Sequence, residues 1–294
     1  MHHAQKIKLD LALYVVATPI GNLRDITLRA LDVLNSAEVV AAEDTRNTAH
    51  LLTHFGISAQ RLLAIHQHNE RGAAEKVIAL LSEGKSVALV TDAGTPAVSD
   101  PGAIVVEEVL RAGFRVIPIP GSSAAIAALS AGGLTSPHFL FYGFLPNKSA
   151  ARRSVLQGLA DHSTTLVFYE APHRILDSVE DLLAVFGAER DIVLAREMTK
   201  LFENIHRCKL GDAMAWLHSD ANNQRGEFVL LLSGAPEKSD GLDSEVERIL
   251  QTLLAELPLK QAVKLAVQIT GNGKNELYQR ALVLKSAADP SNLS

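Results

Sequence analysis

Four short segments in the first half of the chain combine carboxylates with glycine and small polar residues. They are Thr18-Pro19-Ile20-Gly21-Asn22-Leu23, Glu43-Asp44-Thr45-Arg46, Thr91-Asp92-Ala93-Gly94-Thr95-Pro96 and Pro120-Gly121-Ser122-Ser123-Ala124. Small residues let backbone amides and carbonyls approach a ligand closely, and carboxylates can accept a proton or a hydrogen bond. Glycine also occurs in ordinary turns, so a site is expected only where the fold brings these segments together.

Each of the four segments begins where an apolar, strand-like run ends. Strands are predicted over residues 13–19, 37–44, 62–68, 86–92 and 114–120, and helices over 27–35, 45–55, 70–84, 100–113 and 122–131. Asp100 and Pro101 have the types of an N-cap and a first-turn proline for one of these helices. The alternation is typical of a parallel sheet with crossover helices. Because ligands bind beyond the carboxyl ends of such strands, we expect the four segments to line one crevice.

The second half of the chain has a different order of predicted strands and helices and ends in a helical tail. Strands are predicted over residues 139–144, 164–170, 192–197, 201–207 and 227–234, with helices over 149–160, 174–187 and 211–221. The two strands within 192–207 have no helix between them, which indicates an antiparallel pair in a mixed sheet. A polar linker over 235–244 precedes helices at 245–257, 259–270 and 274–285. We therefore predict an α/β fold with a parallel-sheet domain (residues 11–120), a mixed-sheet domain (121–236) and a small helical domain (241–286).

Composition narrows the class of protein. The 294 residues are 47% apolar and carry a formal net charge of −5, so the chain can build aliphatic cores but has no overall basic charge. Any contact with nucleic acid must then use local basic patches. The single cysteine, Cys208, cannot form an internal disulfide, and no apolar run reaches the ~18 residues of a membrane span. We expect a cytoplasmic protein without a membrane segment.

Two common nucleotide-binding motifs are absent from the sequence. It has neither the G-x-x-x-x-G-K-[ST] phosphate loop nor G-x-G-x-x-G after the first strand. A cofactor held by several separate loops is the better interpretation. The pairs His66/His68 and His50/His54 could suggest a metal site, but no matched set of ligands accompanies them, so no metal is expected.

Eight motifs follow one another along the chain in an informative order. They are TPIGNLRDIT, AAEDTR, LVTDAGTPAVSDPG, PIPGSSAAIAALS, GFLP, FYEAPHR, LAREMTK and RGEFVLL. Together they closely resemble the bacterial 16S rRNA (cytidine-2′-O)-methyltransferase I family of the tetrapyrrole methylase superfamily, from about Leu13 to Leu284. The combination of AAEDTR with DAGTPAVSDPG is highly specific. Ser122-Ser123 departs from the pattern, since relatives often have Pro-Cys there, but backbone-mediated binding is not expected to change.

The resemblance implies two α/β domains with S-adenosylmethionine in the cleft between them, and a homodimer. It also implies 2′-O-methylation of a cytidine ribose in the decoding region of 16S rRNA, within the 30S subunit. The cofactor contacts that it implies are Pro19, Asp92, Ala93, Gly94, Thr95, Ser122, Ser123, Tyr169, Ala195, Gly226 and Glu227. Composition and spacing alone lead only to an α/β enzyme that binds a small molecule.

Methyl transfer from a sulfonium is an in-line displacement, so the enzyme must chiefly align donor and acceptor. A ribose hydroxyl is a weak acid, and a nearby base helps to remove its proton. Asp44 is the first candidate for this base, followed by Glu43, because both end a buried strand at the crevice; Glu197 is the candidate from the second domain. Each carboxylate could instead be structural, with Asp44 paired to Arg46 and Glu197 paired to Lys200 or a nearby arginine.

Cations that could contact RNA phosphates occur beside the crevice and in the tail. Residues 258–285 hold five cations and one carboxylate, and the turn Gly271-Asn272-Gly273 gives this segment a helix–turn–helix pattern. The predicted RNA contacts are Arg46, Lys148, Arg152, Arg153, Arg174, Arg196, Lys274 and Arg280. The tail could instead be a helical cap or a dimer arm. Two other functions stay open: methylation of a tetrapyrrole or other small molecule, which the basic tail disfavours, and RNA binding without catalysis, which the carboxylates disfavour.

Overall fold

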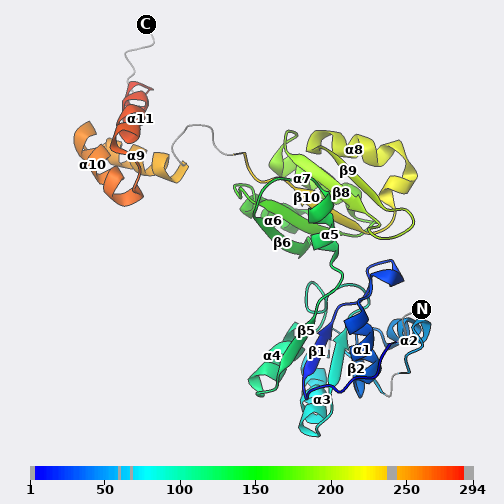
Figure 1. The fold of residues 1–294 in the computed structure, drawn as a ribbon. Coiled ribbons are helices and arrows are strands. Elements are labelled where there is room, and N and C mark those ends of the chain that lie inside the picture. The colour runs from blue at the N-terminus through cyan, green and yellow to red at the C-terminus, as the bar shows by residue number, and fades with distance from the viewer. Residues whose placement is uncertain (1–3, 59–60, 67–68, 237–243, 288–294) are drawn as a thin grey trace. The chain divides into compact units, whose positions relative to one another are not determined.

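The structure, a computed structural model, describes residues 4–58, 61–66, 69–236 and 244–287. The chain divides into two compact units, Met1–Ala235 and Pro236–Ser294. The first unit contains two five-stranded sheets with their helices, and the described part of the second contains three helices (Figure 1). These elements confirm the predicted α/β fold class with a helical tail. No helix within the described ranges is both long and apolar enough to cross a membrane.

The first sheet is parallel throughout, as predicted. Its strands are β1 (Leu13–Val16), β2 (Val39–Ala42), β3 (Leu62–Ala64), β4 (Val87–Val90) and β5 (Val116–Ile119), in the order β3-β2-β4-β1-β5. The connecting helices are α1 (Leu28–Ser36), α2 (Thr45–His54), α3 (Glu70–Ser82) and α4 (Ala103–Arg111), and a 3₁₀ turn, η1, covers Leu23–Asp25. The third strand is shorter than predicted; His68 at its expected end lies outside the described residues.

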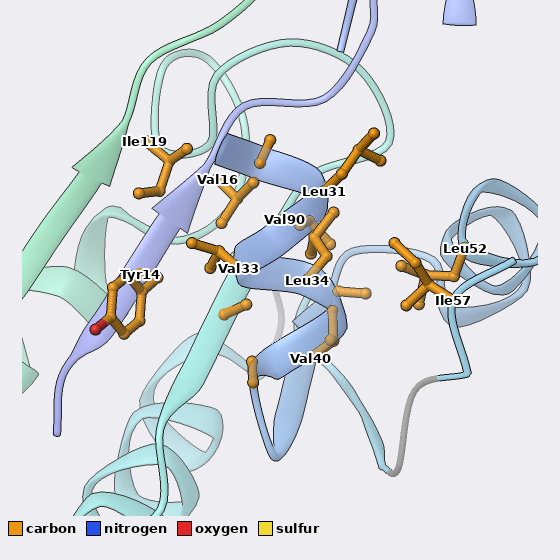
Figure 2. Close-up of a cluster of buried hydrophobic side chains, with 14 of the residues drawn as sticks. Tyr14, Val16, Leu31, Val33, Leu34, Val40, Leu52, Ile57, Val90 and Ile119 are labelled. Carbon is orange, nitrogen blue, oxygen red and sulfur yellow. The ribbon is translucent and has the colours of Figure 1, made fainter. Parts of the chain in front are cut away.

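Apolar side chains cover both faces of this sheet. On one face, Figure 2 shows Leu31 of α1 beside Val16 and Val90 of the central strands. On the other face, α3 and α4 pack against the same strands through Val77 and Val105. Every residue of β2 and β4 is buried, as is usual for central strands that are covered on both sides. The strand ends, and the segments that follow them, are therefore held by a rigid core.

The second sheet is mixed, as predicted. Its strands are β6 (Phe139–Phe144), β7 (Thr165–Glu170), β8 (Asp191–Arg196), β9 (Asn204–Lys209) and β10 (Phe228–Leu232), in the order β6-β7-β10-β8-β9. Only β6 and β7 are parallel; β8 and β9 form the expected antiparallel pair. Helix α5 (Ala124–Ala131) packs on one face, and α6 (Ser149–Gly158), α7 (Ile175–Phe186) and α8 (Leu210–Ser219) pack on the other, with a 3₁₀ turn, η2, at Ala221–Gln224.

The start of α4 differs from the prediction. The helix begins at Ala103, and its N-cap is Gly102 with φ of 124°, so Asp100 is not the cap. The carboxylate of Glu70 accepts hydrogen bonds from the amides of Gly102 and Ile104 at 3.1 and 3.2 Å. A carboxylate from α3 therefore accepts the hydrogen bonds of the first amides of α4, which the local sequence had assigned to Asp100. This leaves the Asp100 side chain available for another role.

The second unit is a small helical bundle. Helices α9 (Ser244–Glu256), α10 (Leu259–Thr270) and α11 (Lys274–Ala287) pack around Leu250, Val263 and Leu277 (Figure 1). Helix α10 ends at Gly271, whose left-handed conformation (φ 72°) turns the chain toward α11. The helix–turn–helix pattern is therefore present. We propose that the domains span residues 11–120, 121–236 and 241–286.

Candidate functional site

Two adjoining cavities lie in the first unit, where strand-end segments of the first sheet meet residues of the second sheet. The first cavity has a volume of about 390 Å³ and the second a volume of about 500 Å³. Ile20, Ala93 and Glu227 line both cavities, so the two share a boundary. Cavities of this size are typical of small-molecule sites.

Hydrogen bonds join the segments after β1, β4 and β5 around the first cavity. Thr18 and Gly94 exchange two backbone hydrogen bonds, with N–O distances of 2.9 and 3.1 Å. Thr95 Oγ1 donates to the carbonyl of Ser122 at 3.1 Å. Gly94 has a φ of 87°, and a Cβ added there would lie 3.4 Å from Ile20 Cγ2. Glycine at this position therefore avoids backbone strain and keeps the cavity open.

The segment after β2 joins the others through carboxylates. Thr91 Oγ1 donates to Glu43 Oε2 at 2.6 Å. The Asp92 carboxylate accepts from the Asp44 amide at 3.2 Å and from the side-chain amide of Asn47 at 2.9 Å. The four segments singled out in the sequence therefore meet at one edge of the sheet, as predicted.

Asp100 contributes an unusual carboxyl group to the first cavity. Burial and then the charge of Glu43 raise the pKa of Asp100 to about 6; the charge of Asp92 also raises it, and a hydrogen bond with Thr91 opposes the shift. Sequence reasoning missed this residue because Asp100 was assigned to a helix cap. One signal could have found it: Asp100 lies in the same segment after β4 as Asp92 and Gly94.

Residues of the second sheet complete the first cavity. The hydroxyl of Tyr169, at the end of β7, accepts a hydrogen bond from the Ala125 amide at 3.2 Å, and burial raises the pKa of Tyr169. Met198, Phe228 and Val229 also line the cavity. Sequence reasoning missed these three because apolar residues at strand ends look the same as core residues.

A lysine and two glutamates form a cluster at the boundary of the cavities. Lys200 Nζ lies 2.8 Å from Glu197 Oε1 and 2.8 Å from Glu227 Oε2, and the Glu227 amide donates to Glu197 Oε1 at 3.0 Å. Burial disfavours the charge of Glu197, but the hydrogen bonds from Lys200 and from the Glu227 amide outweigh it and lower its pKa. A Cβ at Gly226 would collide with the Glu197 carboxyl. Glu197 is therefore held as a paired carboxylate, which was the structural alternative for this residue.

Comparisons with known proteins place this fold and site in a family. Residues 12–214 match the Tetrapyrrole (Corrin/Porphyrin) Methylases family, and residues 240–285 match the RsmI C-terminal HTH domain. Ribosomal RNA small subunit methyltransferase I of Pseudomonas aeruginosa is 54% identical over 272 residues, which cover 92% of this chain and 96% of that protein. The Escherichia coli O157:H7 protein of the same name is 52% identical over 270 residues, covering 92% and 94%. The chain belongs to the ribosomal RNA small subunit methyltransferase I family.

Solved structures of other tetrapyrrole methylases share the fold of the first unit. The methyltransferase CobJ gives a TM-score of 0.58 at 20% identity, over 76% of this chain and 94% of that one. A uroporphyrin-III C-methyl transferase from Thermus thermophilus, complexed with S-adenyl homocysteine, gives 0.52 at 19% identity, over 76% and 97%. Like the rest of its family, the chain is a methyltransferase, and S-adenosylmethionine is its methyl donor.

The first cavity fits this cofactor. S-adenosylmethionine carries a positive sulfonium and an amino group, and Asp100 places a carboxyl group in the cavity beside the charges of Glu43 and Asp92. Six of the predicted cofactor residues line the cavity: Ala93, Gly94, Thr95, Ser123, Tyr169 and Glu227.

The other predicted cofactor residues have different positions. Pro19 and Asp92 line the second cavity. Ser122 accepts the hydrogen bond from Thr95, Ala195 is buried in β8, and Gly226 packs against Glu197. These five therefore adjoin or support the first cavity and do not line it.

Asp44, the first candidate for the base, forms structural contacts at the start of α2. Its carboxylate caps α2 by accepting from the Arg46 amide at 2.8 Å, and it forms a salt bridge of 2.8 Å with the Arg46 guanidinium. These hydrogen bonds lower the pKa of Asp44 to about 2. Asp44 lines neither cavity. A carboxylate with such a low pKa is a poor proton acceptor, which favours the structural alternative; the catalytic role of Asp44 stays a prediction.

The cations predicted to contact RNA differ in accessibility. Arg152 is buried and its Nε lies 2.6 Å from Asp181 Oδ2, so it cannot reach a phosphate without breaking this ion pair; the burial disfavours its predicted RNA contact. Arg153 also pairs with Asp181, but its side chain is 46% exposed. Arg174 is paired with Glu170 and largely buried.

The other predicted RNA cations lie near the surface. Lys148 and Lys274 are exposed, and the Arg46 side chain is 85% exposed. Arg196 donates to the carbonyl of Arg225, and Arg280 of α11 is paired with Glu247 of α9. Within the described ranges, no group of three or more His, Cys, Asp or Glu side chains is arranged to hold a metal ion.

Proposed function

We propose that this methyltransferase modifies the ribose 2′-hydroxyl of a cytidine in the decoding region of 16S rRNA. The relatives that match over 92% of the chain are named ribosomal RNA small subunit methyltransferase I. The observation that carries the proposal is the pair of cavities with a common boundary at Ile20, Ala93 and Glu227. One cavity suits the cofactor, and the other opens beside it for the acceptor.

The chain's own residues would hold the cofactor and align it. Ala93, Gly94, Ser123 and Tyr169 line the first cavity and would contact the cofactor there. The carboxyl of Asp100 attracts the positive charge of the cofactor, whose methyl carbon, bonded to the cationic sulfur, is the electrophile. In-line transfer requires the acceptor oxygen to lie opposite the departing sulfur, and the common boundary of the cavities suits that geometry.

Asp100 is the proton acceptor in this proposal. A base is most effective when its pKa lies near the working pH, and the pKa of Asp100 is about 6. Glu43 is the second candidate for the base, because it accepts a hydrogen bond from Thr91 in the same cluster of carboxylates. Glu197 and Asp44 are already held by Lys200 and Arg46. Asp100 therefore replaces Asp44 as the first candidate.

RNA binding would use local cations on both units. In the first unit, Lys148, Arg153 and Arg46 are the exposed cations among the predicted RNA contacts. In the second unit, Lys264 and Lys274 are exposed. Cations at phosphates displace counterions, so binding should weaken as salt increases.

We further propose a cytoplasmic homodimer that acts on the 30S particle. The side chains of Leu201 and Phe202, 89% and 66% exposed, are apolar surface of the kind that an interface buries. Sedimentation of the purified chain tests the dimer, and a monomer at micromolar concentration would contradict it.

The activity is tested with the purified full chain, labelled S-adenosylmethionine and 30S particles that lack the modification. Alkali cleaves RNA through the 2′-hydroxyl, so a methylated ribose appears as one alkali-resistant linkage. Label in an alkali-sensitive position, such as a base, would contradict the proposal.

A further inference from the structure

Most residues that line the second cavity have no role in the proposed cofactor site. Part of it is a face of α2, where Asn47, His50, Leu51 and His54 follow at helical spacing. The segment after β1, part of the segment after β4, and Lys200 complete the lining. At about 500 Å³ the cavity can hold a group of the size of a nucleoside.

We propose that this second cavity binds the base of the nucleotide that is methylated, turned out of the RNA strand, and that Asn47 recognises the edge of the base. The inference rests on the proposed function and adds to it the site that selects cytidine. Enzymes that modify nucleotides in RNA commonly hold the target base in such a pocket, stacked on side chains and hydrogen-bonded at its edge.

The chemistry of a nucleoside determines where the base must lie. The base is attached to C1′ of the ribose, and the reacting hydroxyl is on the neighbouring carbon, C2′. With the hydroxyl at the common boundary, near Ile20, Ala93 and Glu227, the base lies a few bonds away. The cofactor occupies the first cavity, so the second cavity is the space left for the base.

The lining of the second cavity suits a flat, neutral ring. Ile20, Leu23 and Leu51 offer apolar surface, and His50 and His54 offer rings of the type on which bases stack. A phosphate fits less well, because Asp92 and Glu227 line the cavity and Lys200 is already bound by two glutamates. The negative charges of Asp92 and Glu227 would repel a bound anion.

Asp92 fixes the orientation of the Asn47 side chain. An ionised carboxylate only accepts hydrogen bonds, so the group that lies 2.9 Å from Asp92 Oδ2 must be the amide nitrogen of Asn47. The other end of the amide, Oδ1, is then an acceptor. An acceptor pairs with the exocyclic amine of cytosine and is repelled by the carbonyl that uracil has at the same place. The pair of Asn47 and Asp92 therefore favours cytidine over uridine.

The test compares Asn47→Ala with Thr53→Ala, which lies on the same helix but lines neither cavity. Each full-length variant receives 30S particles with the mapped cytidine or with uridine in its place. We expect Asn47→Ala to bind S-adenosylmethionine as the parent does in calorimetry, and to lose about 10-fold or more in kcat/KM for cytidine and in the ratio of cytidine to uridine. Thr53→Ala should match the parent in cofactor binding, in kcat/KM for cytidine and in the ratio of cytidine to uridine.

A second variant, Leu23→Trp, fills the same cavity from the segment after β1. It should raise KM for 30S particles several-fold with unchanged cofactor affinity. If the parent methylates the particles and Asn47→Ala keeps the full rate and the same preference for cytidine, the base site is refuted and the methyltransferase function stands. If the parent transfers no methyl group to 30S particles, the proposed function fails and the base site fails with it.

Discussion

Glu43 and Asp100 share the side chain of Thr91, and the negative charge of Glu43 acts directly on the Asp100 carboxyl. Thr91 Oγ1 donates to Glu43 Oε2 at 2.6 Å. Burial of Asp100 and this neighbouring charge raise the pKa of Asp100 to about 6. The site therefore holds a carboxyl group that changes charge close to physiological pH, beside the place where a cationic cofactor fits.

The first prediction concerns the pH dependence of methyl transfer. Only ionised Asp100 accepts a proton, so kcat/KM for the cofactor, which reports the free enzyme, should rise with pH and level off above about pH 6. Asp100→Asn should lower kcat by about 10²–10⁴-fold and remove this rise. Rate measurements on 30S particles from pH 5 to 8 check both. An Asp100→Asn variant that keeps the parent's profile would exclude Asp100 as the base.

The same substitution should stabilise the fold at neutral pH. The pKa of Asp100 is raised from 3.8 to about 6, so the folded protein holds this proton more tightly than the unfolded chain. The resulting stability is present below about pH 4 and is lost as pH rises through about 6. Asp100→Asn should therefore unfold with a free energy about 1–2 kcal/mol higher than the parent at pH 8, and with little difference near pH 4. Urea titrations at the two pH values measure this; an equal effect at both would contradict a charge-based cause.

Asp44→Ala should affect folding more than turnover. The variant loses the cap of α2 and the salt bridge with Arg46, so its melting temperature should fall by about 2–4 °C. Because the pKa of Asp44 is lowered to about 2, its contribution is present at neutral pH and lost as pH falls through that value. The parent and the variant should converge in strongly acidic solution, and turnover at pH 7 should stay within a few-fold. A loss of 100-fold or more with an intact fold would restore Asp44 as the base.

Gly94→Val should abolish cofactor binding. The side chain would strain a backbone with φ of 87° and fill space next to Ile20. Gly56→Val is the matched control, because Gly56 has φ of 68° with nothing within 4 Å of an added Cβ. Both variants should lose similar stability, but only Gly94→Val should lose the heat of S-adenosylmethionine binding in calorimetry. Equal losses of binding would attribute the effect to backbone strain alone.

The parallel first sheet and the meeting of the four segments followed from local patterns. Apolar runs such as that ending at Val90 predict buried strands, and carboxyl ends of parallel strands must share an edge. The surroundings of Asp100 and Arg152 could not be predicted locally, because the residues that determine them are distant in sequence. Glu70 replaces Asp100 as the helix cap, and Asp181 draws Arg152 into the core. Such contacts depend on tertiary packing, which periodicity does not encode.

Removal of residues 241–294 should weaken RNA binding and leave cofactor binding intact. Every proposed cofactor contact lies in the first unit, whereas Lys264 and Lys274 are exposed on the second. The truncated chain should bind 30S particles more weakly and with a smaller dependence on salt. Charge reversal at Lys264 and Lys274 should reproduce much of the loss; reversal at Arg280 would instead break its pair with Glu247. Full methylation by the truncated chain at limiting enzyme and physiological salt would refute this role.

Mapping the transferred methyl group tests the central claim most directly. The full chain is incubated with unmodified 30S particles and labelled S-adenosylmethionine, and the 16S rRNA is then hydrolysed with alkali and digested to nucleosides. The account predicts one labelled, alkali-resistant linkage, with the label in 2′-O-methylcytidine, and almost none from Asp100→Asn. Label on a base or on another nucleoside, or equal labelling by Asp100→Asn, would contradict it.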